Sequence, residues 1–292
     1  MSAIGRFVCF VHIERSGGTT LHQILRHGIP GYFAVKPWFY WANEAGAALG
    51  ERELRLLKLT VPPLRGLGGH TVRPSEDYGR VFGSDPVWLT VLRRPADRYL
   101  SHLNYQRLKM GIPWTFDQFA SEPRFNNFQT IRLAGEADVG KAIARLDQFD
   151  FVGLSEEYAK SVLILSRLLP VRPFNFRINE MPKSNDMITP ASLTKEQQER
   201  VRHNNELDLR LYEHASKVLF PRFRETYEGD LDADEKAFRE TESRPPYSIV
   251  DKLYVRLCKR FGEWAAHRLS GGTPSLPAQF SEIRREVMRG RE

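Results

Sequence analysis

The chain has 292 residues, 41% of them hydrophobic, with 18 Phe and 5 Trp, which excludes a disordered protein and leaves enough apolar side chains for a large core. Two cysteines, Cys9 and Cys258, are too few for a disulfide framework and are typical of a reducing compartment. Most of the net charge of +7 lies in residues 236–292, so the near-neutral remainder argues against nucleic-acid binding. The sequence contains no run of roughly 20 apolar residues that would predict a membrane span.

The first predicted strand covers residues 6–13, and a helix is predicted over residues 19–27. The string HIERSGGTTL, residues 12–21, joins them. Gly17 and Gly18 lack the Cβ atoms that would block approach to the backbone, and the helix start offers unpaired N–H groups and the positive end of its dipole. This turn is therefore suited to a phosphate-like anion.

Polar side chains in the same turn also favour an anion. Thr19 and Thr20 add hydroxyl donors, and Arg15 adds a positive charge that can bind two oxygens. The string is not the GxxxxGK[ST] loop of nucleotide triphosphatases, because it lacks the Lys and the glycine spacing. The alternative is a glycine-rich turn that binds nothing.

A second apolar strand is predicted over residues 86–93 and ends at Arg93. Pro95 suits the first turn of a helix over residues 96–110. Arg93 at the strand's carboxyl end and Ser101 two turns into the helix are placed to hold a second phosphate, because ligands bind at such strand ends in open α/β sheets. Alternatively, Arg93 is a surface residue and Ser101 packs between helices.

Strands and helices alternate along the rest of the chain. Further strands are predicted over residues 67–70, 150–154 and 174–178. Further helices are predicted over residues 51–59, 126–134, 139–148, 155–169 and 194–225. The last of these opens with a capping box formed by Thr194 and Gln197. The alternation predicts an α/β fold with a parallel sheet covered by helices on both faces.

Two strings together resemble one family, the carbohydrate sulfotransferases related to the heparan sulfate 2-O- and 6-O-sulfotransferases. HIERSGGTTL resembles that family's 5′-phosphosulfate loop, commonly HIPKTGGTT, and LRRPADRYLSHLNY resembles its 3′-phosphate loop, LRDPxxRxxSxYxY. Shorter matches follow in the family's order at residues 68–70, 127–130, 149–156 and 205–212. The resemblance spans roughly residues 6 to 227 and implies a P-loop-like parallel sheet.

The resemblance implies an enzyme that moves a sulfuryl group from 3′-phosphoadenosine 5′-phosphosulfate to a hydroxyl of a carbohydrate or related acceptor, in-line and without a metal. His70 matches the histidine of the family's GH segment and is predicted as the base; alternatively it is a loop residue bonded to the backbone. Arg15 is predicted as the second catalytic residue. The donor-binding residues implied by the two loops are Arg15, Ser16, Gly17, Gly18, Thr19, Thr20, Leu21, Arg93 and Ser101.

Two positions depart from the family pattern. Arg15 stands where the family commonly has Lys, so it can stabilise charge on the leaving oxygen but is a poor acid. Glu14 stands in place of Pro and brings a negative charge to a polyanionic donor, unless it points away or pairs with an arginine. A catalytically weak or inactive nucleotide-binding relative therefore stays open. A kinase-like phosphoryl transferase is a further alternative, but it needs a P-loop Lys and magnesium ligands that the sequence does not place.

The remaining histidines carry less weight, and none has metal-ligand spacing. His12 is predicted as a satisfied imidazole at the strand end or, alternatively, as a residue that orients the loop, and His22 and His102 as solvated or packing residues of helices. The aromatic run PWFYW, residues 37–41, with Trp114, either forms a platform for sugar rings or belongs to the core.

Three domain-level segments are expected: a catalytic domain over residues 1–230, a linker over residues 231–246 and a basic helical extension over residues 247–292. Apolar residues in the extension recur at helical spacing, with basic residues elsewhere around the helix. Residues 247–270 are predicted to dock onto the catalytic domain or a partner subunit, or to contact an anionic membrane surface.

Two smaller expectations follow from the family's layout. Lys183 and Ser184 lie in a loop expected to close over the nucleotide. Animal relatives are commonly Golgi enzymes with a membrane anchor. Because this sequence shows no anchor and its first strand starts near residue 6, we expect a cytoplasmic, bacterial protein.

Overall fold

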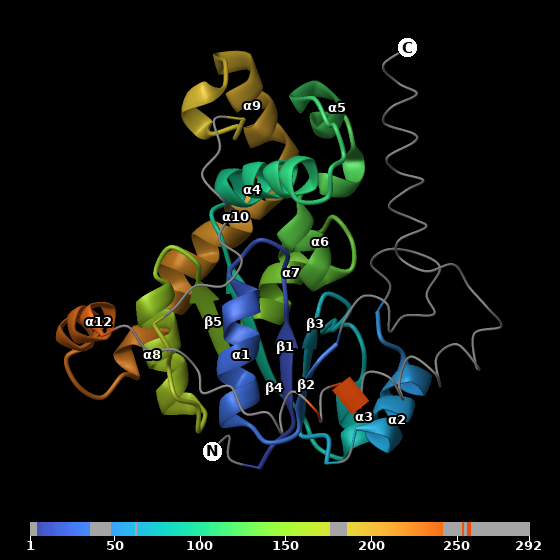
Figure 1. Cartoon of the computed structure of the whole chain (residues 1–292), viewed down its shortest axis with the longest axis vertical. Coiled ribbons are helices and arrows are strands. Elements are labelled where there is room, and N and C mark those ends of the chain that lie inside the picture. The colour runs from blue at the N-terminus through green and yellow to red at the C-terminus, as the bar shows by residue number, and fades with distance from the viewer. Residues whose placement is uncertain are drawn as a thin grey trace.

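The computed structural model describes residues 5–35, 48–61, 63–175 and 186–241, together with Leu253, Arg256 and Leu257. Five strands form one sheet in the order β2-β3-β1-β4-β5, and every neighbouring pair is parallel (Figure 1). The strands are β1 Val8–Val11, β2 Tyr32–Ala34, β3 Gly66–Gly69, β4 Val87–Leu92 and β5 Phe151–Leu154. The α/β fold with a parallel sheet is confirmed.

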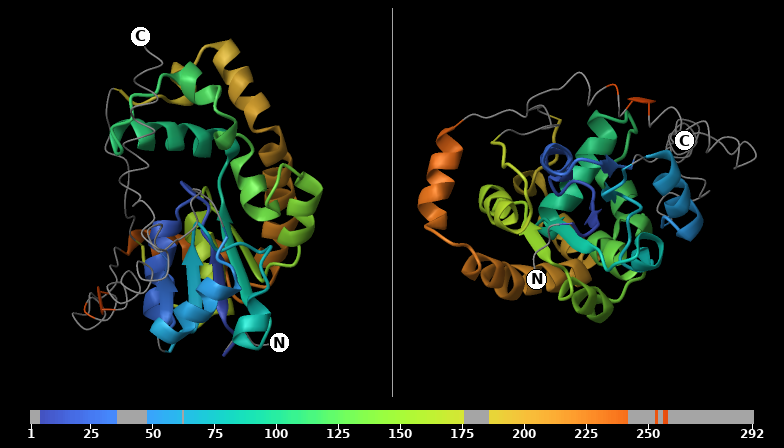
Figure 2. Two further views of the ribbon diagram at one scale, coloured as in Figure 1. Left: turned by 90° about the vertical axis from the view of Figure 1, so that its right-hand side faces the viewer. Right: turned by 90° about the horizontal axis from the view of Figure 1, so that it is seen from below.

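Helices cover both faces of this sheet. In the two views of Figure 2, α1 and α8 lie on one face, while α7 and α11 lie on the other. The helices are α1 Gly18–Gly28, α2 Glu51–Thr60, α3 Tyr78–Phe82, α4 Pro95–Leu108, α5 Phe116–Ala120, α6 Phe128–Ala134, α7 Val139–Leu146, α8 Tyr158–Leu168, α9 Lys195–Asn204, α10 Glu206–His214, α11 Phe220–Glu225 and α12 Leu231–Glu240. A π-helical segment, Ala215–Leu219, joins α10 to α11.

The strand order places a topological switch beside β1. β1 lies between β3 and β4; the chain leaving β1 crosses towards β2, while the chain leaving β4 runs in the opposite direction towards β5. In open α/β sheets, ligands bind outside the carboxyl ends of the strands where the connections diverge in this way. The fold therefore marks the loops after β1 and β4 as the place for a ligand.

A second group of helices lies across the carboxyl edge of the sheet. α4 crosses this edge, with α5 and α9 beyond it (Figure 1). These helices share their own hydrophobic cluster, separate from the sheet core, in which Phe119 stacks on Phe125 with ring centroids 4.0 Å apart. Trp114 is buried in this cluster and its indole N–H donates to Gln106 Oε1. We call α4, α5 and α9 the helical cap, and Trp114 is one of its core residues. Residues 37–41, the other part of the predicted aromatic platform, lie outside the described residues.

The predicted helix over residues 194–225 is wrong in one respect, because it breaks at Asn205 between α9 and α10. Asn127, from the segment before α6, takes the backbone groups at the break: its amide N–H donates to the Asn204 carbonyl, and its side-chain oxygen accepts from the Leu207 amide. The predicted capping box of Thr194 and Gln197 is present in both directions.

The predicted linker over residues 231–246 is wrong over its first ten residues, which form α12. This helix packs against α8, where Lys160 pairs with Asp232 at 2.6 Å and with Glu235 at 3.4 Å. The sequence did not predict this helix, because the segment is mostly polar and Leu231 is its buried apolar residue.

Other expectations fall partly outside the described residues. Phe174 and Asn175 are not in a strand, and the rest of the strand predicted over residues 174–178 lies outside. Lys183 and Ser184 also lie outside, as does the predicted extension apart from its three described residues. Across the described ranges, no helix combines the length and the apolar character needed to span a bilayer. The cytoplasmic location stays a prediction.

Candidate functional site

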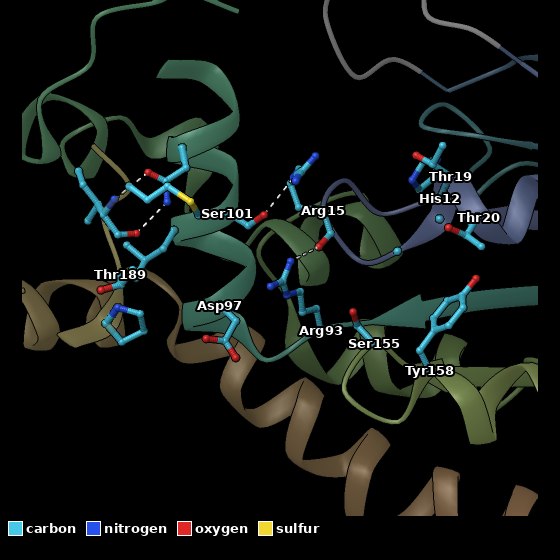
Figure 3. A pocket seen from close by; sticks show the side chains of 17 residues that line it. His12, Arg15, Thr19, Thr20, Arg93, Asp97, Ser101, Ser155, Tyr158 and Thr189 are labelled. Atoms are coloured by element: carbon cyan, nitrogen blue, oxygen red, sulfur yellow. Dashed lines mark hydrogen bonds between the residues drawn. The ribbon is translucent and has the colours of Figure 1, made fainter. Parts of the chain in front are cut away.

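A cavity of about 440 Å³ lies where the switch in topology predicts a ligand. One wall is the loop from β1 to α1, and the facing wall is the loop after β4 together with α4 (Figure 3). Ser155, after β5, Tyr158, at the start of α8, and residues 187–190, on the chain before α9, complete the lining. The two strings that suggested separate anion sites thus lie on one cavity.

The first wall is made of backbone that approaches closely. Gly17 has a φ of 86°, a left-handed conformation suited to glycine, and caps α1 without a side-chain hydrogen bond. At Gly18 a Cβ atom would lie 2.1 Å from Cδ2 of His12, so the position has room for no side chain. The N-cap residue Gly17 makes no side-chain hydrogen bond to the start of α1, and such a helix start, with the positive end of its dipole, is suited to an anion.

Arg15 joins the two walls. Its Nε donates to Ser101 Oγ at 3.0 Å, its guanidinium carbon lies 4.8 Å from the Tyr105 ring centroid, and its carbonyl accepts from Arg93 Nη1 at 2.9 Å (Figure 3). Arg15 has a φ of 69°, a left-handed conformation uncommon for residues other than glycine. Burial lowers the pKa of Arg15 and the charge on Arg93 lowers it further, while Tyr105 opposes the shift. Among the described residues, no carboxylate forms an ion pair with Arg15, which leaves its charge for a ligand.

The backbone of Arg93 is held by the buried side chain of Gln129. Gln129 Oε1 accepts from the Arg93 amide at 3.0 Å, and Gln129 Nε2 donates to the Arg93 carbonyl at 2.9 Å. The amides of Gln129 and Thr130 in turn donate to the Asp208 carboxylate at 3.0 and 2.7 Å. Burial raises the pKa of Asp208, although nearby Arg98 opposes the shift. A chain of contacts therefore runs from α10 through α6 to the end of β4.

His70 follows β3 and lies beside the first wall. Its Nδ1 is 3.0 Å from the His12 carbonyl oxygen and 3.6 Å from Glu14 Oε2. A carbonyl only accepts, so Nδ1 carries the proton of the neutral ring and Nε2 is its basic nitrogen. His70 is not among the cavity-lining residues; the His12 ring, with its centroid 4.3 Å away, is the one that reaches the cavity. The predicted base is thus adjacent to the cavity without lining it.

Glu14 is paired with an arginine, one of the two arrangements expected for it from the sequence. Its Oε1 accepts from Arg132 Nη2 at 2.6 Å. Burial alone would raise the pKa of Glu14, but the charges on Arg132 and His70 outweigh burial and the pKa is lowered. Glu14 therefore faces His70 and Arg132 as a carboxylate.

Most of the sequence-predicted donor residues line this one cavity: Arg15, Gly17, Gly18, Thr19, Thr20, Arg93 and Ser101. Ser16 and Leu21 do not line it, and donor binding by them stays a prediction. Both are 1% exposed, because Leu21 points from α1 into the sheet core and Ser16 lies beneath the turn.

Asn104 was missed by sequence reasoning although it lines the cavity. Its side chain forms two hydrogen bonds with the backbone of Ile188, donating to the carbonyl at 2.7 Å and accepting from the amide at 2.9 Å. One turn further along α4, Arg107 donates to the Asp186 carbonyl. These contacts hold the segment that contains residues 187–190 against α4. No local sequence pattern signals them, because the partners are far apart in the chain.

Comparisons with known proteins add no family to this geometry. No protein-family model matches the chain, and no curated protein matches it. Within the described ranges, no group of three His, Cys, Asp or Glu side chains is arranged to hold a metal ion.

Proposed function

We propose that this chain is a sulfotransferase that uses 3′-phosphoadenosine 5′-phosphosulfate as donor. The observation that carries the proposal is that the loops after β1 and β4, each suited to an anion, line one cavity and are joined by the contact between Arg15 and Ser101. A ligand with an anionic group at each end satisfies both walls at once. The cavity of about 440 Å³ is within the size range of small-molecule sites.

Each wall suits one end of the donor. The uncapped start of α1 offers backbone N–H groups to the 5′-phosphosulfate. Arg93 and Ser101 offer a guanidinium and a hydroxyl to the 3′-phosphate. Arg15 lies between them and stabilises charge on the oxygen that leaves sulfur.

In the proposed reaction, an acceptor hydroxyl oxygen attacks sulfur and forms a new O–S bond, while the S–O bond to the 5′-phosphate breaks. In this proposal the acceptor approaches from the side of the cavity next to His70, and the hydroxyl proton passes to Nε2 of His70, whose Nδ1 is held by the His12 carbonyl. The Glu14 carboxylate at 3.6 Å stabilises the imidazolium that results. The products are the sulfated acceptor and 3′-phosphoadenosine 5′-phosphate. A carbohydrate as acceptor rests on the sequence resemblance.

One observation favours a second candidate, a nucleotide-binding relative without turnover. The Arg15 side chain is engaged by Ser101 and Tyr105, on the α4 side of the cavity. If it stays there with the donor bound, charge on the leaving oxygen lacks this stabilisation, and one such donor contributes roughly 3 kcal/mol to catalysis.

The test has two steps. Calorimetry with 3′-phosphoadenosine 5′-phosphate is expected to show binding that both Arg93→Ala and Ser101→Ala weaken. Incubation with radiolabelled phosphosulfate donor and a panel of glycans is then expected to label an acceptor with the wild-type protein and not with His70→Ala. Binding without transfer to any acceptor supports the second candidate. Absence of nucleotide binding contradicts both, and labelling from ATP in magnesium indicates phosphoryl transfer instead.

A further inference from the structure

Three buried side chains form a line of hydrogen bonds behind the first wall of the cavity. The Tyr32 hydroxyl in β2 lies 2.7 Å from Nδ1 of His22 in α1. Nε2 of His22 lies 3.0 Å from Nδ1 of His12, which follows β1. All three residues are at most 9% exposed, and His12 is the member that lines the cavity.

These groups are uncharged near neutral pH. Burial lowers the pKa of His22 to about 3, helped by the neighbouring His70 and Arg26. Burial also lowers the pKa of His12 well below its usual value, with further lowering from His70, His22, Arg132 and Arg15. Burial raises the pKa of Tyr32. The line therefore consists of neutral donors and acceptors whose order can be worked out.

The order starts at Tyr32. Within the part of the chain that the structure describes, the hydrogen-bond partner of its hydroxyl is His22 Nδ1. A buried hydroxyl needs an acceptor, so Tyr32 donates to Nδ1 and the ring proton of His22 is on Nε2. That proton is donated to His12 Nδ1, which leaves the ring proton of His12 on its own Nε2.

The Nε2 edge of His12 faces the start of α1. A Cβ atom at Gly18 would lie 2.1 Å from Cδ2 and 2.3 Å from Nε2 of this ring. Figure 3 shows His12 beside Thr19 and Thr20 at the same end of the cavity. Across the described ranges, no hydrogen-bond acceptor takes Nε2 of His12, and its N–H is placed beside the first backbone N–H groups of the helix.

We propose that Tyr32 and His22 are positioning residues that hold His12 with its Nε2–H directed at the 5′-phosphate of the nucleotide. The inference rests on the proposed function for the identity of that nucleotide. His12 then contributes a neutral donor to a site whose other side-chain donors include two guanidinium groups. It differs in role from His70, whose proton is held on Nδ1 and whose Nε2 has no hydrogen-bond partner within the described ranges.

Removing one hydroxyl tests the chain of hydrogen bonds at its far end. Tyr32→Phe is expected to weaken binding of 3′-phosphoadenosine 5′-phosphate about five- to tenfold, because the lost hydrogen bond joins two neutral groups. Tyr78→Phe is the matched control, because Tyr78 is 1% exposed and its hydroxyl accepts from the Arg73 amide away from the cavity. The control is expected to change affinity less than about twofold. Equal affinities of the two variants overturn the proposal.

Nitrogen chemical shifts of the imidazole rings provide a readout that does not depend on the ligand. In the wild-type protein, His12 and His22 are expected to carry the proton on Nε2 and to show no titration between about pH 5 and 8, the range in which an ordinary histidine titrates. Tyr32→Phe is expected to change the His22 tautomer, whereas Tyr78→Phe leaves it unchanged. A proton on Nδ1 of His12, or titration of its ring in that range, overturns the proposal. If wild-type protein binds no nucleotide, the proposed function fails, and the ring spectra still decide the order of the hydrogen bonds.

Discussion

The two main walls of the cavity are each suited to an anion, but by different means. The β1–α1 wall uses backbone N–H groups, made accessible by Gly17 and Gly18, with neutral imidazoles behind it. The β4–α4 wall uses charged and hydroxyl side chains, Arg93 and Ser101, with a buried amide and carboxylate behind it. We expect the first wall to be sensitive to shape and the second to charge.

The largest effect is expected where shape matters most. Gly18→Ala places a methyl group against the His12 ring, so the ring or the helix start must move. Overpacking of this kind typically costs about 1–3 kcal/mol, and we expect nucleotide affinity to fall by roughly two orders of magnitude because the backbone donors and His12 shift together. Chemical denaturation and calorimetry measure the two effects. Gly140→Ala in α7 is the control, since its Cβ would meet only Asp138 Oδ1 at 3.4 Å; an equal loss of affinity there would refute the shape argument.

The second effect concerns charge. Arg93→Ala removes a guanidinium from the facing wall, and we expect nucleotide affinity to fall about 10- to 100-fold, the range for a lost hydrogen bond to a charged group. The loss should be smaller at high salt, because screening already weakens the wild-type interaction. Arg94→Ala is the control, because Arg94 is the next residue, is exposed and does not line the cavity. Titrations of both variants at two salt concentrations measure the difference, and a salt-independent loss would count against the charged wall.

A smaller effect is expected from changing Gln129, whose side chain holds the Arg93 backbone. Gln129→Leu keeps the size of the side chain but removes both hydrogen bonds to the Arg93 backbone. We expect about 1–3 kcal/mol of lost stability for the buried groups left without partners, and a loss of nucleotide affinity of several-fold. Denaturation and calorimetry again measure both. Unchanged affinity with reduced stability would show that Gln129 supports the fold and does not position Arg93.

The smallest effect is expected from mild acid. Burial lowers the pKa of His22 in α1 and of His102 in α4 to about 3, and it lowers that of His12 as well. The unfolded chain binds protons below about pH 6.5 while these folded rings stay neutral, so stability is complete above that pH and falls as pH decreases towards 3. From pH 7.5 to 6.0 we expect the three rings together to cost about 2 kcal/mol of stability, with little effect on nucleotide affinity. Denaturation at the two pH values measures it, and a pH-independent midpoint would contradict burial of neutral rings on both sides of the cavity.

The sequence predicted the elements that carry a strong local signal. The apolar runs of β1 and β4 predicted buried parallel strands, and both loops that follow them line the cavity. The three-residue strand β2 was missed because it is too short to show periodicity, and α12 was missed because Leu231 is its one buried residue.

The supporting contacts of the site were beyond the reach of the sequence. Gln129 is 36 residues from Arg93, and Asp208 is 79 residues from Gln129, so no window of sequence shows that they meet. Glu14 illustrates the same limit. Its partner Arg132 is 118 residues away in the sequence. When that contact is not known, a carboxylate at this position is expected only to repel an anionic ligand.

The link between Arg15 and Ser101 spans two separately packed bodies, since Arg15 extends from the sheet while Ser101 lies on α4, next to Leu100 of the helical cap's cluster. A ligand that contacts both sides would hold these two bodies together. Part of its binding free energy then opposes separation of the helical cap from the sheet. Ligand binding is therefore expected to raise the melting temperature in proportion to the logarithm of the ligand concentration.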